Sequence, residues 1–155
     1  MEHRTFLIVA VFAVIIHILE EYRFDWVKWA NDFIPGIAFG QFIIVNALFV
    51  ILCLMAAIVG GGSIVFSSSI FSLLLVNSLI HITTTIKLGK YSPGLVSAVL
   101  IFIPLGLYGY NNLFKQDMIT GKEFMISMFV GILWMSFPLI YHLILTRKQN
   151  NKNKK

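Results

Sequence analysis

The chain is 155 residues long, and its composition is that of an integral membrane protein. Hydrophobic residues make up 58% of the chain and charged residues only 12%, and the mean hydropathy of +0.85 lies far above that of an average soluble protein. The net charge of +5 comes from loops and the C-terminal end, and the basic residues form no stripe interleaved with aromatic residues, so we expect no binding to nucleic acid. The single cysteine, Cys53, excludes an internal disulfide bond.

Five apolar segments approach or exceed the roughly 20 residues that a helix needs to cross a bilayer. They predict an all-α, polytopic membrane bundle of five transmembrane helices. We expect one domain, residues 1–146, followed by a basic, solvated and disordered tail, residues 147–155. The first segment has the charged start and apolar centre of a signal peptide, but no small-residue cleavage site follows it, so we interpret it as an uncleaved span. The predicted spans cover residues 5–22, 38–59, 63–86, 94–110 and 124–145.

The connections between these segments differ in character. Residues 20–36 form an amphipathic segment with two of the three tryptophans, which is typical of a helix at the membrane interface. The uncharged sequence GGGS at 60–63 predicts a tight turn and therefore an antiparallel hairpin. Nine of the twelve basic residues fall on the side that holds the C-terminus. Since cytoplasmic loops are the more basic ones, we expect the plasma membrane of a prokaryote, with the N-terminus outside and the C-terminus in the cytoplasm.

Ionisable side chains occur in predicted spans at one common depth. His17, Glu20 and Glu21 share a face of the first helix through their i, i+3 and i+4 spacing, and Asn77 and His81 share a face of the third. The first and third helices run in the same direction, so these residues lie near the same membrane face. Ionisable groups at membrane depth usually point into the bundle and pair with one another. The sequence therefore predicts one buried site near the cytoplasmic leaflet.

Three interpretations of this cluster remain open. Nitrogen and oxygen donors without a thiolate suit a divalent metal, such as zinc, iron or manganese, with His17, Glu20, Glu21 and His81 as ligands. His142, at a similar depth in the fifth span, is an additional candidate. Alternatively, a protonated histidine bridges the two carboxylates in a relay that contains no metal. In the third interpretation, the carboxylates end a helix in water and pair with nearby basic residues.

The segments His17-Ile-Leu-Glu20-Glu21, Asn77-Ser-Leu-Ile-His81 and Tyr91-Ser-Pro93-Gly94 resemble, in order and separation, the three signatures of the HXXEE-motif family of membrane proteins. The resemblance covers residues 5–110 and implies a shared site without naming its chemistry. His142 and the fifth span are not part of that pattern. The residues that the resemblance assigns to the site are His17, Glu20, Glu21, Asn77, His81, Tyr91, Pro93 and Gly94.

Pro93 and Gly94 also have a physical interpretation. Proline is tolerated in the first turn of a helix and biases the residue before it away from helix, so the fourth span begins here. The free amides at this helix start would face the layer of the cluster and offer a subsite for an anionic or oxyanionic part of a substrate.

The functional expectation is a metal-dependent membrane enzyme that acts on a lipid or another amphipathic substrate. Glu21 would act as a general base, with Asn77 and Tyr91 as further catalytic residues. Hydrolysis, isomerisation and oxidation remain open. The alternatives are a transporter that handles protons or metal ions through the same cluster, which would need a dimer because the spans are few, and a structural or partner-binding membrane subunit. Membrane lipids are the expected partners, and a homo-oligomer is allowed.

Overall fold

The computed structural model describes residues 3–152, and no strand occurs among them. Apolar segments of this length satisfy their own backbone hydrogen bonds only as helices when no water is present. The fourth apolar segment is composite, because a π-helical turn joins its two α-helical parts. In chain order the elements are α1 (His3–Arg23), α2 (Trp26–Asn31), α3 (Phe39–Val59), the 3-10 turn η1 (Gly60–Ser63), α4 (Ile64–Leu88), α5 (Leu95–Ser97), the π-helical turn η2 (Ala98–Phe102), α6 (Ile103–Lys115) and α7 (Gly121–Lys152).

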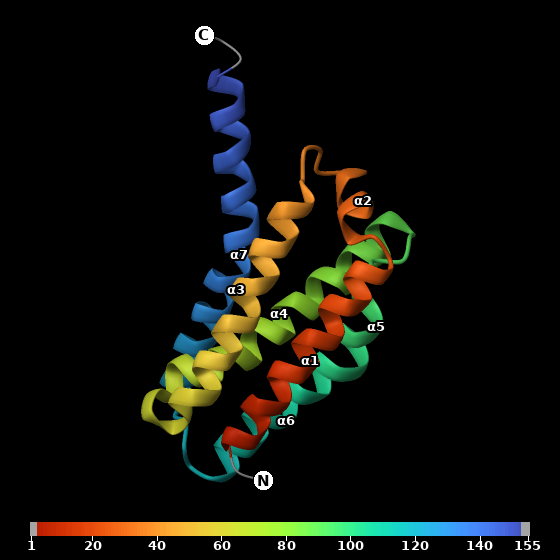
Figure 1. Cartoon of the computed structure of the whole chain (residues 1–155). Helices are drawn as coiled ribbons and strands as arrows, with labels where there is room; N and C mark the ends of the chain where they lie inside the picture. The colour runs from red at the N-terminus through yellow and green to blue at the C-terminus, as the bar shows by residue number, and fades with distance from the viewer. Residues whose placement is uncertain (1–2, 153–155) are drawn as a thin grey trace.

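Several helical stretches are long and apolar enough to cross a membrane. The stretch Phe39–Leu88 contains both α3 and α4, which η1 separates. Gly60 begins η1 with a φ of +54°, a conformation that glycine adopts without strain. The chain then turns back, so that α4 leaves η1 in the opposite sense to α3, as the GGGS sequence predicts (Figure 1). The other such stretches are His3–Arg23, Leu95–Lys115 and Gly121–Arg147.

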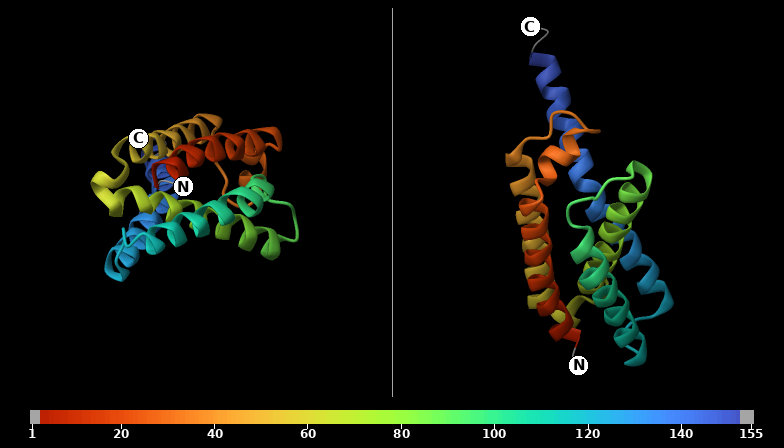
Figure 2. Two further views of the ribbon diagram at one scale, coloured as in Figure 1. Left: turned by 90° about the horizontal axis from the view of Figure 1, so that it is seen from below. Right: turned by 90° about the vertical axis from the view of Figure 1, so that its right-hand side faces the viewer.

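The helices form two layers. α1 packs along α3 in one layer, and α4 packs against η2 and α6 in the other, while α7 lies on the outer side of α4 (Figure 2). Apolar side chains from both layers fill the space between them. Among those that are completely buried are Leu7, Val14, Phe71, Leu74 and Phe102. The layers place the buried faces of α1 and α4 opposite each other, which positions the candidate site.

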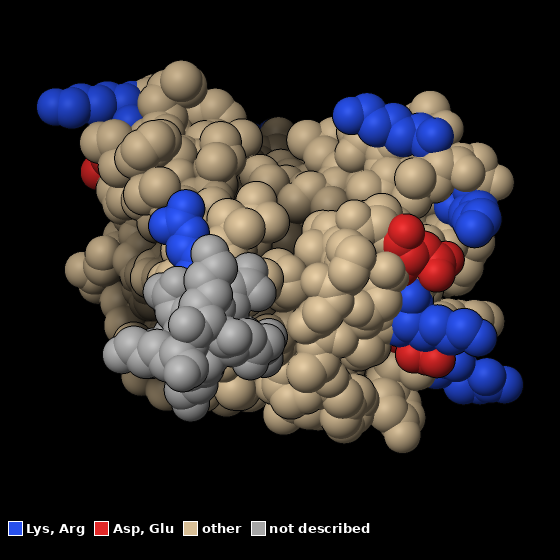
Figure 3. Space-filling model, turned by 90° about the horizontal axis from the view of Figure 1, so that it is seen from above, with Lys and Arg blue, Asp and Glu red and all other residues tan. Residues whose placement is uncertain are grey.

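The outer surface of this bundle is apolar along its sides. Large hydrophobic side chains such as Ile58, Ile86 and Leu100 are 72%, 75% and 69% exposed. Exposed apolar area on this scale marks contact with lipid or with another protein. Charged side chains gather instead around the rim of the end from which α7 emerges (Figure 3). This distribution supports the expectation of a membrane protein.

The C-terminal segment differs from the expectation of a disordered tail. α7 continues to Lys152, so residues 147–152 are helical, and residues 153–155 lie outside the described part of the chain. No proline or glycine follows Pro138 to end the helix. The prediction of disorder is therefore wrong for residues 147–152.

Candidate metal centre between the ends of α1 and α4

Three buried side chains from two helices converge near the C-terminal ends of α1 and α4. His17 and Glu21 lie one helical turn apart on α1, and His81 lies on α4. The Nε2 atom of each histidine is 3.5 Å from the same oxygen, Oε1 of Glu21. All three potential ligand atoms lie within 4.8 Å of one another. The prediction that the first and third spans bring these residues together is confirmed for His17, Glu21 and His81.

The spacing of these atoms fits a metal ion. Zinc binds histidine nitrogen and carboxylate oxygen at about 2.0–2.2 Å, so neighbouring donors in a tetrahedral complex lie about 3.4 Å apart. The two nitrogen–oxygen distances of 3.5 Å are close to that value. Nε2 of His17 is buried and makes no hydrogen bond. The group therefore has donor types that bind metals, two donor distances close to those of a tetrahedral complex, and a ring nitrogen without a hydrogen bond.

Two serines orient the histidine rings. Nδ1 of His17 lies 2.9 Å from Oγ of Ser97, and Nδ1 of His81 lies 2.9 Å from Oγ of Ser92. The hydroxyl of Ser97 donates a hydrogen bond to the carbonyl oxygen of Gly94 at 3.2 Å. Its oxygen therefore accepts the hydrogen bond from Nδ1 of His17. In a neutral imidazole this places the ring hydrogen on Nδ1 and leaves Nε2 of His17, which lies 3.5 Å from Oε1 of Glu21, as the acceptor. Hydrogen bonds of this kind fix the orientation of metal-binding histidines in proteins.

Gly94 packs directly against the two rings. A Cβ atom at this position would lie 2.6 Å from Cε1 of His17 and 2.8 Å from Cε1 of His81. Gly94 also has a φ of +99°, which side chains strongly disfavour. The glycine of the YSPG segment is thus required by space as well as by conformation, and Pro93 before it is buried.

Glu20 lies outside this group of three. It accepts hydrogen bonds from the backbone N–H groups of Val96 at 3.0 Å and Ser97 at 2.7 Å, and from the hydroxyl of Tyr91. Desolvation and the bond to Glu20 raise the pKa of the Tyr91 hydroxyl above its usual value. The amides that we expected to bind part of a substrate are therefore used by Glu20, which holds the start of α5 against α1.

Asn77 is not part of this group of three and lines a cavity between α3, α4 and α7. The cavity has a volume of about 530 Å³, and Glu21 also borders it. Oδ1 of Asn77 is buried without a hydrogen bond, and Nδ2 lies 3.9 Å from the sulfur of Met135. Asn46, which the sequence analysis did not identify, lines the same cavity and contacts Oε2 of Glu21 at 3.5 Å. Its only sequence signal is an amide within an apolar span.

His142 lines this cavity but is absent from the group of three. Its Nδ1 atom lies 3.4 Å from Oε1 of Gln41, and its Nε2 atom lies 3.4 Å from the hydroxyl of Thr146. These contacts use both ring nitrogens. The structure therefore gives His142 a place in the cavity wall rather than beside His17 and His81.

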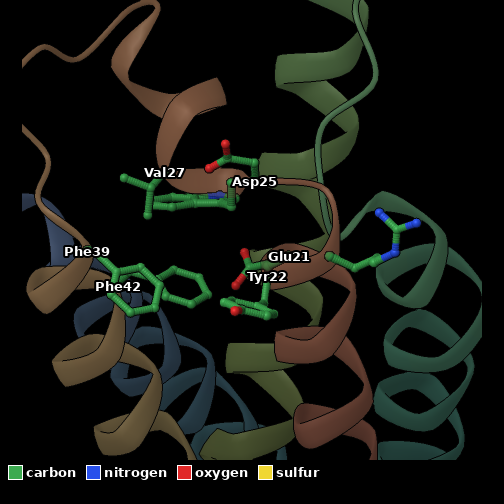
Figure 4. Close-up of a pocket in the computed structure, with 8 residues that line it drawn as sticks. Glu21, Tyr22, Asp25, Val27, Phe39 and Phe42 are labelled. Atoms are coloured by element: carbon green, nitrogen blue, oxygen red, sulfur yellow. The ribbon is translucent and has the colours of Figure 1, made fainter.

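A second pocket reaches Glu21 from the polar end of the bundle. It has a volume of about 350 Å³, and its lining includes Asp25 and Arg23. Figure 4 shows the carboxylate of Glu21 pointing into this pocket, across from the rings of Phe39 and Phe42. Glu21 thus borders both a pocket with charged walls and an apolar cavity.

Fold and site together define an all-helical, strongly apolar protein with a buried His–Glu–His group. The model of the family described as "Protein of unknown function with HXXEE motif" matches residues 8–109, so the chain belongs to this family. The chain is also 33% identical over 63 residues to "Uncharacterized protein YrkK" of Bacillus subtilis (strain 168). That match spans 39% of this chain and 40% of the relative. No solved structure matches the chain.

Proposed function

We propose that the protein spans the plasma membrane of a prokaryote five times, as helices α1, α3, α4, α5–α6 and α7. The alternating direction of these helices supports five crossings, and the bacterial relative supports a prokaryotic membrane. The basic loops favour a cytoplasmic C-terminus and an N-terminus outside. The His–Glu–His group then lies near the cytoplasmic leaflet.

The proposed site binds a divalent metal, either zinc, iron or manganese, through His17, Glu21 and His81. The observation that carries this proposal is the convergence of three buried donor atoms within 4.8 Å of one another, with Nε2 of His17 free of hydrogen bonds. Ser97 and Ser92 hold the rings in place. Two histidines and one carboxylate leave coordination positions open, which is typical of catalytic rather than structural metal sites.

The proposed activity is that of a membrane enzyme acting on a lipid or another amphipathic substrate. A bound divalent metal would polarise a carbonyl or phosphoryl oxygen or activate water. The apolar cavity beside Glu21 supports a substrate with a hydrocarbon part, and the pocket with charged walls supports access for water. Asn77 is placed to contact the substrate, while Tyr91 positions Glu20 and α5. Glu21 remains our candidate for a general base through its second oxygen.

Metal analysis of the purified protein tests this proposal. We expect about one metal ion per chain in detergent-purified protein and its loss in both His17→Ala and His81→Ala. His142→Ala is the matched control, because this histidine lies outside the group of three and should leave the metal content unchanged. A wild-type protein that takes up no metal, or alanine variants that keep it, would refute the metal site.

A relay for protons is the second candidate, because both histidines lie 3.5 Å from one carboxylate oxygen and could share a proton with it. This function predicts a flux across liposome membranes that persists after chelation and disappears in Glu21→Gln. A structural or partner-binding role predicts instead that His17→Ala, Glu21→Gln and His81→Ala leave the cellular phenotype of the protein unchanged.

A further inference from the structure

We infer that the cavity between α3, α4 and α7 binds an uncharged amphiphile with one hydrocarbon chain, whose head carries a hydroxyl group that contacts Asn77. This inference rests on the proposed function only for the reaction that would follow. Binding itself needs the cavity and not the metal, so the two can be tested separately.

Asn77 supplies the contact for the head group. Its side chain is 6% exposed, it lines the cavity, and its Oδ1 atom has no hydrogen-bond partner. A buried amide oxygen without a partner is unfavourable, so a ligand that donates a proton to it gains binding energy. A hydroxyl group donates a hydrogen bond without bringing a charge into the cavity, so it satisfies Oδ1 of Asn77.

The charge of the cavity wall argues against an anionic head group. Glu21 is the only acidic residue that borders the cavity, and no lysine or arginine lines it among the described residues. In the metal-free protein, a carboxylate or phosphate in this cavity would meet the negative charge of Glu21 without a lysine or arginine to offset it. A neutral head such as that of a monoacylglycerol or a long-chain alcohol avoids this cost.

The remainder of the cavity fits a single hydrocarbon chain. Its volume of about 530 Å³ lies within the roughly 300–1,000 Å³ of sites that hold one small molecule. Away from the amides its wall is mainly aliphatic and aromatic. Several wall residues on α3 and α7 are also more than a third exposed, and we infer that the cavity opens towards the lipid between these helices. These exposed wall residues are Leu48, Ile51, Met55, Trp134 and Phe137.

Photolabelling in lipid nanodiscs tests this inference. The probe is a monoacylglycerol with a photoreactive diazirine in its chain, and a fatty acid with the same chain is the anionic comparison. We expect mass spectrometry to find the label on the cavity faces of α3 and α7, and excess unlabelled monoacylglycerol to compete for it. In protein stripped of metal, the fatty acid should label these positions at least tenfold less.

Two variants separate specific binding from contact with bulk lipid. Val45→Trp fills part of the cavity and should abolish competed labelling, whereas Ile58→Trp, on the exposed side of the same helix, should not change it. Asn77→Leu should weaken the competition by about tenfold, which corresponds to one hydrogen bond. Wild-type protein stripped of metal should label as strongly as the untreated protein.

Several results would overturn the inference. Label spread evenly over the lipid-facing residues, or label that Val45→Trp does not reduce, would show that the cavity holds no specific ligand. Equal labelling by the fatty acid, or unchanged competition in Asn77→Leu, would refute the neutral head group. The metal content of Val45→Trp is measured in the same preparation, so a lost metal site is distinguished from a lost amphiphile site.

Discussion

Substitution of Gly94 by alanine should both destabilise the protein and weaken metal binding. The new methyl group would lie 2.6 Å from His17 and 2.8 Å from His81, and the backbone has a φ of +99°. A positive φ costs a residue with a side chain roughly 1–2 kcal/mol, and overpacking of a buried site costs typically 1–3 kcal/mol. We therefore expect a loss of about 2–5 kcal/mol in the free energy of unfolding.

Gly89 provides the matched control. It also has a positive φ, of +61°, but a Cβ atom there would contact nothing within 4 Å. Gly89→Ala should therefore lower the free energy of unfolding by only the backbone strain, about 1–2 kcal/mol, and leave the metal site intact. Unfolding in mixed micelles measures the stability of both variants, and competition with a chromophoric chelator measures their affinity for zinc. We expect Gly94→Ala to lower that affinity by about 10–100-fold, because displaced rings no longer meet at one position.

Equal stability and equal metal affinity in the two glycine variants would refute this reasoning. That result would mean that Gly94 does not pack tightly against the rings of His17 and His81. If Gly94→Ala lowered the stability but left the metal affinity unchanged, Gly94 would pack against the rings without contributing to metal binding.

Three other substitutions test the contacts around the site. Ser97→Ala leaves Nδ1 of His17 without its partner and should lower zinc affinity by about 10–100-fold in the chelator assay, whereas Ser97→Thr should retain it. Glu20→Gln weakens the hydrogen bonds to the start of α5 and should lower the free energy of unfolding by about 1–2 kcal/mol without changing the metal content; loss of metal would instead make Glu20 a ligand. The pKa of Tyr91 is raised in the folded protein, so its contribution to stability is complete below the ordinary tyrosine pKa of about 10 and is lost as the pH rises through the folded value. Unfolding midpoints should therefore fall less steeply above about pH 10 in Tyr91→Phe, and identical slopes would contradict this assignment.

The bundle and the meeting of its histidines could be predicted because both depend on simple periodicities. Apolar segments of membrane-spanning length predicted α1, α3 and α4 to within two residues at each end, whereas α7 continues to Lys152, beyond the predicted end at residue 145. The i, i+4 spacing of His17 and Glu21, together with the common direction of α1 and α4, predicted their meeting with His81. These predictions need only the pitch of a helix and the alternation of spans.

The separate roles of the two adjacent carboxylates could not be predicted. Glu20 and Glu21 are consecutive, so they point about 100° apart around α1 and meet different neighbours. Which of them faces His81 and which faces α5 depends on the rotation of α1 in the bundle, and the spacing of residues does not determine that rotation. Asn77, one turn before His81 on the same face of α4, lines the neighbouring cavity instead of joining the group of three.

The serines that orient the rings were also missed. Ser92 and Ser97 are small polar residues at the start of a helix, where serine is common for reasons unrelated to a site. Their function appears only when α5 is placed against α1. The YSPG segment contained Ser92, but no spacing rule in the sequence connected Ser97 with His17, which lies 80 positions earlier.

The π-helical turn η2 makes the position of Ser97 depend on a single backbone insertion. Ile103 donates its N–H to the carbonyl of Ala98, five residues earlier, and Pro104, the next residue, has no N–H to donate. If the same residues wound as an ordinary α-helix, with none removed, everything before them would rotate by about 100° relative to α6. Such a change of winding would leave the length and hydropathy of this segment unchanged while carrying the hydroxyl of Ser97 away from the imidazole of His17. The π-helical turn thus determines how Ser97 is rotated relative to α6.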